Sequence, residues 1–236
     1  MDAKEALIRL GGVAPAAAIR RLASARSLAR AIESGTVVRD GRGRYSLRTM
    51  DDALHAANAL SGTVSHLSAA LFWGWELKSA VPLPQITVPR KRRVTPERRS
   101  AVRLHWADLT PDQISPPGVT SRPRTITDCL TTCPFDEALA VADSSLRHGA
   151  FTPEGLRALA TSLRGPGSGA ARRAATLADA RAANPFESVL RALAIDARLD
   201  VEPQEQIGEF RPISSMSDDA WFSRLTHTRG TAADLL

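Results

Sequence analysis

Cysteine, lysine and aromatic residues are all scarce in this chain of 236 residues. The only cysteines, Cys129 and Cys133, lie four positions apart and have no second pair to complete a zinc site. We therefore expect free thiols in a reducing cytoplasm. Lysine occurs only at Lys4, Lys78 and Lys91, so nearly all basic residues are arginine, a bias that we attribute to a GC-rich coding sequence.

Long apolar runs are also missing. No stretch approaches the roughly 18 apolar residues that a membrane-spanning helix needs. The first residues, MDAKEALIRL, contain two acids and no apolar core of a signal peptide. We expect a cytoplasmic protein without a membrane partner. A composition of 43% hydrophobic and 24% charged residues is ordinary for a globular chain, and the length allows one large domain or two to three small ones.

What the chain does have is positive charge at one end. Residues 1–48 hold ten Lys/Arg against four acids, an excess of six that equals the formal charge of the whole chain. A basic excess confined to one segment suggests a polyanionic partner, usually nucleic acid. The alternative is a solvated basic face with no partner.

The same segment has the element order of a helix-turn-helix followed by a β-wing. Helices are predicted at 2–10, at 13–22 with Pro15 in its first turn, and from the N-cap Ser24 to Gly35. In the third helix Leu28, Ala31 and Ile32 form the expected buried stripe. Residues 37–38 and 45–47 are the expected wing strands, joined by the turn 40–44, whose glycines suit positive φ.

This arrangement predicts a duplex DNA interface. Arg26, Ser27 and Arg30 would face the major groove, where arginine can bind guanine through two hydrogen bonds. The wing arginines would reach a phosphate or the minor groove. The alternative is a winged helix used only for protein contacts. The predicted DNA-binding residues are Arg20, Arg21, Arg26, Ser27, Arg30, Arg39, Arg42 and Arg44.

A second basic cluster follows a predicted strand at 84–89. Arg90, Lys91, Arg92 and Arg93 begin it, and a strand at 102–106 ends it, which together predict a hairpin with a positively charged loop. Such a loop could extend the DNA footprint along the phosphate backbone. It could equally be a solvated, mobile turn.

Further on, the pattern is mainly helical. His66 precedes an apolar helix, and we expect a structural or capping role for it. Residues 164–169 form the clearest linker. A helix opens with Asn184 as N-cap, Pro185 at N1 and Glu187 at N3. The expected buried face of this helix consists of Phe186, Val189, Leu190, Leu193 and Ala197. A strand is predicted at 205–210. We expect residues 211–236 to be irregular or disordered.

Several short stretches, in order along the chain, carry a resemblance to a known family. The chain resembles a large actinobacterial group of AbiEi-family antitoxins of type IV toxin–antitoxin systems. Many members carry a C-terminal domain of unknown function related to very-short-patch-repair endonucleases. The matching stretches are Arg44-Tyr45-Ser46-Leu47, Ser65-His66-Leu67-Ser68-Ala69-Ala70, Thr87-Val88-Pro89-Arg90, Thr120-Ser121 with Arg124-Thr125 and Asp128, Asp136-Glu137-Ala138-Leu139, and Pro185-Phe186-Glu187-Ser188.

The resemblance implies a DNA-binding winged helix at 5–47. It also implies repression of the chain's own promoter, or neutralisation of a cognate toxin. In the nuclease-like domain, Glu187 would be the first acidic position of a metal site that needs two or three converging carboxylates.

That pattern stops after Phe210. Asp218 and Asp219 lie in a stretch without strand character, and no lysine follows Lys91 to complete a D…(D/E)xK motif. We expect a frameshift or truncation near residue 211, which leaves Glu187 as a capping residue and only a vestigial catalytic candidate.

The sequence thus predicts a helix-rich α+β chain. Its expected domains are a winged helix at 1–48, a central α/β domain at 49–165 that dimerises or holds the partner, and the start of a truncated restriction-endonuclease-like domain at 166–210. The predicted function is a DNA-binding transcriptional regulator resembling an AbiEi-type antitoxin, with no catalysis, cofactor or metal of its own. The alternative is a metal-dependent endonuclease of the very-short-patch-repair-like type, expected to be inactive here through loss of its C-terminal acids.

Overall fold

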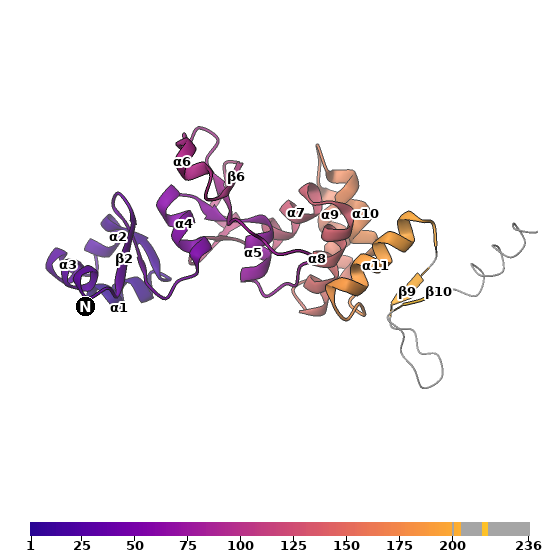
Figure 1. The fold of residues 1–236 in the computed structure, drawn as a ribbon, viewed down its shortest axis with the longest axis horizontal. Helices are drawn as coiled ribbons and strands as arrows, with labels where there is room; N and C mark the ends of the chain where they lie inside the picture. The colour runs from indigo at the N-terminus through magenta and orange to yellow at the C-terminus, as the bar shows by residue number, and fades with distance from the viewer. Residues whose placement is uncertain (200, 204–213, 217–236) are drawn as a thin grey trace, which may run out of the picture. The chain divides into compact units, whose positions relative to one another are not determined.

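The structure, a computed structural model, describes residues 1–199, 201–203 and 214–216, and its fold is α+β and rich in helix (Figure 1). The described helices are α1 (Ala3–Arg9), α2 (Ala16–Arg20), α3 (Ala25–Glu33), α4 (Asp52–Leu60), α5 (His66–Phe72), α6 (Pro96–Arg99), the 3-10 turn η1 (Pro111–Gln113), α7 (Arg122–Thr132), α8 (Phe135–Arg147), α9 (Pro153–Ser162), α10 (Ser168–Leu177) and α11 (Pro185–Asp196). The described strands are β1 (Val13–Pro15), β2 (Val37–Gly41), β3 (Arg44–Leu47), β4 (Thr63–Val64), β5 (Gln85–Val88), β6 (Arg103–Trp106), β7 (Ile114–Ser115), β8 (Val119–Thr120), β9 (Val201–Pro203) and β10 (Ser214–Met216). Within the described ranges, no helix is both long enough and apolar enough to cross a membrane.

The N-terminal part combines α1, α2 and α3 with an antiparallel sheet of order β1-β3-β2. Its core contains Leu7, Ile19, Leu28 and Val37. The prediction that a helix starts at Val13 was wrong, because residues 13–15 pair with β3 as strand β1 and Pro15 becomes the N-cap of a shorter α2. Proline fits there because its missing N–H is needed by neither the strand edge nor the helix start.

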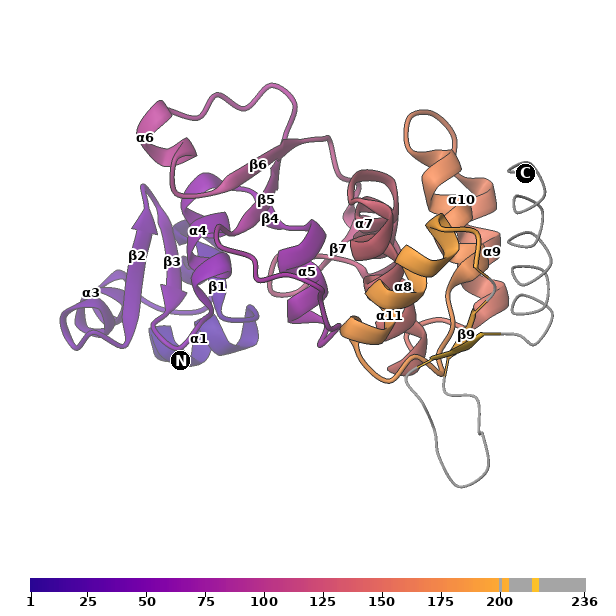
Figure 2. The same ribbon diagram turned by 45° about the vertical axis from the view of Figure 1, so that its right-hand side comes forward.

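A five-stranded mixed sheet, of order β6-β5-β4-β8-β7, follows along the chain. The predicted hairpin at 84–106 was wrong, because β5 and β6 pair in parallel, Gln85 opposite Arg103 and Val88 opposite Trp106. Parallel neighbours need a crossover of about a dozen residues or more. Residues 89–102 provide it, and α6 lies within it (Figure 2).

By internal contacts the chain divides into two compact units. The first comprises Met1–Gly74 and Ala80–Asp128, and the second comprises Trp75–Ser79 and the chain from Cys129 onward. The division therefore falls inside α7. It does not follow the boundaries predicted at 48 and 165 from charge and linker composition.

The second unit packs α8 against α10 and α11. Almost all of α8 is buried, from Glu137 to Leu146. The predicted buried face of α11 was wrong: Phe186 is 67% and Leu193 58% exposed, Leu190 and Ala197 are also exposed, and Val189 is only half-buried. The helix instead buries Glu187, Ser188, Arg191 and Ala192. A polar face is buried because Asp143 of α8 accepts a hydrogen bond from Arg191 at 2.8 Å.

Strands β9 and β10 form a two-stranded antiparallel sheet. The prediction of an irregular tail was therefore wrong for residues 214–216, which pair with residues 201–203. The rest of the predicted tail, residues 211–213 and 217–236, lies outside the described residues, as does the strand predicted at 205–210.

Candidate nucleic-acid interface

Helix α3 begins and ends where the sequence predicts. The hydroxyl of Ser24 accepts a hydrogen bond from the N–H of Ser27 at 3.2 Å, which caps the helix. Gly35 follows the last turn with φ of +70°, the left-handed conformation of a helix C′ position. Leu28 and Ala31 are buried as predicted, but Ile32 is exposed, so the apolar stripe is narrower than expected.

The face of α3 away from that stripe is basic. Arg26 and Arg30, one turn apart, are exposed, as are Arg20 and Arg21 at the end of α2. None of these four arginines forms an ion pair within the part of the chain that the structure describes. Their guanidinium groups are therefore available to an anionic partner.

Ser27 makes a structural contact that the sequence did not predict. Its hydroxyl accepts a hydrogen bond from the N–H of Ala3 at 2.9 Å, and the residue is half-buried between α3 and α1. The side chain therefore fastens the first turn of α1 to α3. The sequence holds one indication of this contact: Ser27 directly precedes Leu28 and so lies at the edge of the buried stripe of α3.

The hairpin of β2 and β3 carries three more of the predicted arginines. Arg39 and Arg42 are exposed, whereas Arg44 is half-buried and lines a cavity of about 210 Å³ together with Asn58, Thr63 and Pro117. Of the two predicted turn glycines only Gly43 has a positive φ, +69°. Gly41 belongs to β2, where a Cβ atom would lie 3.1 Å from the carbonyl oxygen of Ala59.

A polar contact holds this hairpin against α4. The Asp40 carboxylate lies 2.8 Å from Nδ1 of His55 and accepts a second hydrogen bond from the Asn58 amide, which also donates to the Tyr45 carbonyl. Because a carboxylate can only accept, Nδ1 of His55 carries the proton. The Asp40 side chain is only 3% exposed, so the acid of the hairpin is turned away from the arginines.

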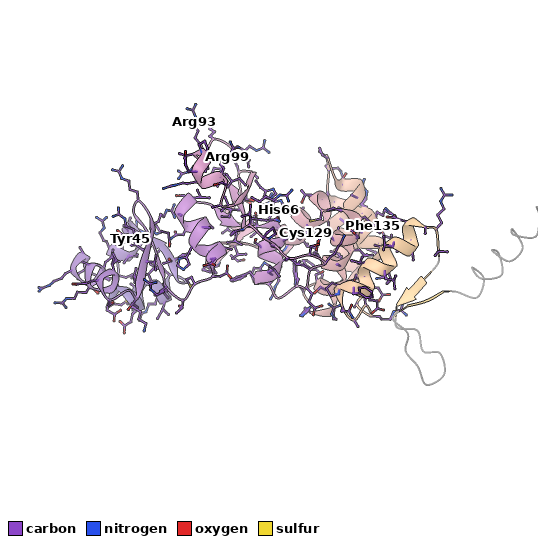
Figure 3. All side chains as sticks on the ribbon, viewed as in Figure 1. Tyr45, His66, Arg93, Arg99, Cys129 and Phe135 are labelled. Atoms are coloured by element: carbon purple, nitrogen blue, oxygen red, sulfur yellow. The ribbon has the colours of Figure 1, made fainter. Side chains whose placement is uncertain are left out.

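The crossover between β5 and β6 holds the second basic cluster. Arg90, Lys91, Arg92 and Arg93 are exposed, and Arg93 and Arg99 project from this segment (Figure 3). The segment is fastened at several points: the indole N–H of Trp106 donates to the Arg92 carbonyl at 3.3 Å, and the guanidinium of Arg99 lies 5.1 Å from the centre of the Trp106 ring. These contacts favour an ordered basic surface over a purely mobile turn.

A polar cluster that the sequence did not predict lies beneath the same sheet. The rings of His66 and His105 stack with centroids 3.5 Å apart. Thr87 donates to the Ser65 hydroxyl, which lies 2.9 Å from Nδ1 of His66. His66 has φ of +52°, a conformation that costs about 1–3 kcal/mol in a residue other than glycine. Periodicity could not reveal this stack, since β6 and α5 are distant in sequence.

Burial and neighbouring cations disfavour charge on both rings. Burial lowers the pKa of His66 to about 3, assisted by His105, Arg124 and Arg103. Burial and Arg103 lower the pKa of His105 to about 4. Burial also raises the pKa of Asp128, although Arg124 opposes that rise with a hydrogen bond at 2.9 Å. Both histidines are therefore neutral near pH 7, which suits a packed core.

Glu187, the vestigial catalytic candidate, is 0% exposed in the second unit. Its carboxylate accepts a hydrogen bond from the N–H of Ala183 at 2.8 Å, and its own N–H donates to the Asn184 side chain at 3.0 Å. The predicted N-cap and N3 positions of α11 are thus confirmed. Among the described residues, no group of three or more His, Cys, Asp or Glu side chains is placed to hold a metal ion.

No model of a known protein family and no curated protein matches this sequence. Among solved structures, the chain is similar to the RV2827C protein from Mycobacterium tuberculosis, with 13% identity, a TM-score of 0.39, and coverage of 87% of this chain and 85% of that one. A likeness at this level does not establish a shared fold.

Proposed function

We propose that the chain is a regulator that binds double-stranded DNA through an N-terminal winged helix-turn-helix. The observation that carries the proposal is the pair Arg26 and Arg30. Both are exposed on one face of α3, while Leu28 and Ala31 dock its opposite face on the core. A recognition helix needs such a division between a docking stripe and a polar face.

The other arginines have complementary roles in this proposal. Arg26 and Arg30 enter the major groove, where arginine binds guanine or phosphate. Arg20 and Arg21 of α2, and Arg39, Arg42 and Arg44 of the wing, contact the phosphate backbone. The half-buried position of Arg44 makes it the weakest of these contacts. The Ser27 oxygen accepts the N–H of Ala3, and its O–H can still donate to a phosphate, so Ser27 has a secondary role in this proposal.

The resemblance to AbiEi-family antitoxins suggests which cellular process the proposed regulator serves. We infer a cytoplasmic regulator that represses its own promoter or neutralises a cognate toxin, with dimerisation through parts of the chain outside the winged helix. Among the described residues the endonuclease alternative has no supporting observation, since the buried Glu187 accepts a hydrogen bond at the start of α11.

A binding measurement with a double variant tests the DNA-binding proposal. Fluorescence anisotropy with a duplex of random sequence, across a series of salt concentrations, should show affinity that falls steeply with salt. In the variant Arg26→Ala/Arg30→Ala, the slope of log affinity against log salt should decrease by up to about 2, roughly one for each of these arginines that contacts phosphate rather than a base. Selection from the same random pool should also show a changed sequence preference.

A matched control separates this effect from a general loss of charge. Arg157 on α9 and Arg172 on α10 are exposed arginines of the second unit, so Arg157→Ala/Arg172→Ala removes the same charge elsewhere. This control variant should bind like the wild type. Salt-insensitive binding, absence of binding, or an equal loss in the control variant would overturn the proposal.

A further inference from the structure

The wing and the basic crossover are far apart in sequence, yet one helix end lies against both. A Cβ atom at Gly41, near the wing tip, would lie 3.1 Å from the carbonyl oxygen of Ala59 in α4. A Cβ atom at Gly62, just after α4, would lie 2.7 Å from Cγ2 of Ile86 and 3.0 Å from Cγ1 of Val88, both in β5, the strand that leads into the crossover. The C-terminal end of α4 is therefore packed between the wing tip and the start of the crossover.

Glycine at both positions permits this close approach. The contact is reinforced on the wing side by the hydrogen bonds that Asp40 accepts from His55 and Asn58 of α4. On the sheet side, α4 packs directly on β4 and β5. The wing and the strand from which the crossover starts are thus both in contact with the same helix.

The charges on these two segments point to the kind of partner. The crossover carries six cations, and none of them forms an ion pair with a described residue: Arg90, Lys91, Arg92, Arg93, Arg98 and Arg99. The crossover contains one acid, the exposed Glu97 of α6, and Asp108 after β6 accepts the N–H of Arg90 at 3.1 Å. The positive charges therefore remain in large excess, and a polyanion relieves the repulsion between them.

The anchored aromatic ring gives the crossover a defined shape. Trp106 is 39% exposed, donates to the Arg92 carbonyl, and supports Arg99 on its ring face. An ordered basic segment loses less conformational entropy on binding than a mobile one. The crossover is consequently suited to hold phosphates, and not merely to remain solvated.

We propose that the β5–α6–β6 crossover continues the phosphate-binding surface of the wing, so that duplex DNA contacts both segments across the C-terminal end of α4. This inference rests on the proposed function of the wing. The crossover contacts are with phosphates and are independent of base sequence, whereas α3 supplies sequence preference. The partner of the crossover is therefore the DNA backbone beside the site that α3 reads.

Binding of the full chain to duplex DNA tests the inference, with three variants that each remove two arginines. The crossover variant is Arg92→Ala/Arg93→Ala, the α3 variant is Arg26→Ala/Arg30→Ala, and the control variant is Arg157→Ala/Arg172→Ala. For the crossover variant we expect a salt slope lower by about 2, affinity about tenfold weaker or more at about 0.1 M salt, and unchanged sequence preference. Arg92→Lys/Arg93→Lys keeps the charge and should restore the slope.

Each outcome has a distinct consequence. A crossover variant that matches the control variant in slope and affinity overturns the inference, while loss of preference in the α3 variant leaves the proposed function standing. If the lysine variant loses as much affinity as the alanine variant, the contact is not electrostatic and the inference also fails. An α3 variant with unchanged binding overturns the proposed function and with it the inference that rests on it, and so does a wild type that binds no duplex.

Discussion

The carboxylate of Asp40 on β2 lies 2.8 Å from Nδ1 of His55 on α4, and this contact fixes the β2–β3 hairpin to that helix. Ser46 of β3, fully buried, places its hydroxyl 2.8 Å from the same nitrogen. The hairpin is consequently fastened through both of its strands. A hairpin held in this way presents Arg39 and Arg42 from a fixed position.

Removal of the Asp40 carboxylate should loosen the hairpin. Asp40→Ala leaves the His55 N–H and the Asn58 amide without their shared acceptor, at a cost of about 1–3 kcal/mol in unfolding free energy. Urea unfolding followed by circular dichroism measures the loss, and hydrogen exchange should localise it to β2 and β3. The neighbouring exposed residue offers a control, since Arg39→Ala should unfold like the wild type. Equal midpoints for Asp40→Ala and Arg39→Ala would show that the contact contributes nothing.

Glu187 should prove to be a structural residue. Glu187→Ala removes the acceptor for the Ala183 N–H within a buried site, so we expect the second unit to lose about 1–3 kcal/mol of stability. Thermal unfolding measures the loss, and Asn184→Ala, which removes the cap on the same helix, should cost about 1 kcal/mol. A Glu187→Ala protein with wild-type stability, but without a Mg²⁺-dependent nicking activity that the wild type has, would support the endonuclease alternative.

Asp143 should make the stability of the second unit depend on pH. Burial raises its pKa to about 6 from 3.8, although Arg191 opposes that rise. Because the folded state then binds the proton more tightly, the carboxyl contributes stability that is present below about pH 4 and lost as the pH rises through about 6. The advantage of wild type over Asp143→Asn should therefore shrink between pH 4 and pH 7, by at most about 1.4 kcal/mol per pH unit. Urea unfolding of wild type and Asp143→Asn across this pH range measures the difference in unfolding free energy. A difference that grows in favour of wild type as the pH rises would contradict the raised pKa of Asp143.

His66 should give the opposite pH dependence in the first unit. Its pKa is lowered from 6.5 to about 3, so the unfolded chain binds the proton more tightly. The stability that the neutral ring contributes is fully present above about pH 6.5 and is lost as the pH falls toward 3. His66→Asn keeps a residue that tolerates the left-handed backbone but does not titrate. Wild type should lose stability relative to this variant from pH 7 to pH 4, and parallel curves would argue against a buried, neutral His66.

Local signals in the sequence were sufficient for helix ends. Ser24, Gly35 and Asn184 stand where predicted, because capping depends on residues within one turn of each other. Such local signals could not predict whether two neighbouring strands run parallel or antiparallel. A charged stretch between two apolar strands fits a hairpin loop and a crossover equally well, and only pairing in the sheet decides between them.

The same limit explains α11 and the histidine stack. Apolar periodicity assigns Phe186, Leu190 and Leu193 to the core, but the core side of α11 is chosen by Asp143, which lies 48 positions before Arg191. His66 and His105 meet only after β5 and β6 have paired. A single sequence carries no record of these long-range partners. The α+β class and most helices could be predicted, whereas the cluster beneath the sheet could not.

The parallel pairing of β5 and β6 has a kinetic consequence. Before the two strands can register, the chain must close a loop of fourteen residues, 89–102, and loop closure without local pairing slows folding. Most of that loop's charges are of one sign, so their repulsion opposes closure until counterions screen it, within about 10 Å at 0.1 M salt. The refolding rate of the first unit should therefore rise with ionic strength. The charge that we propose for binding DNA phosphates is, during folding, an obstacle to forming the sheet.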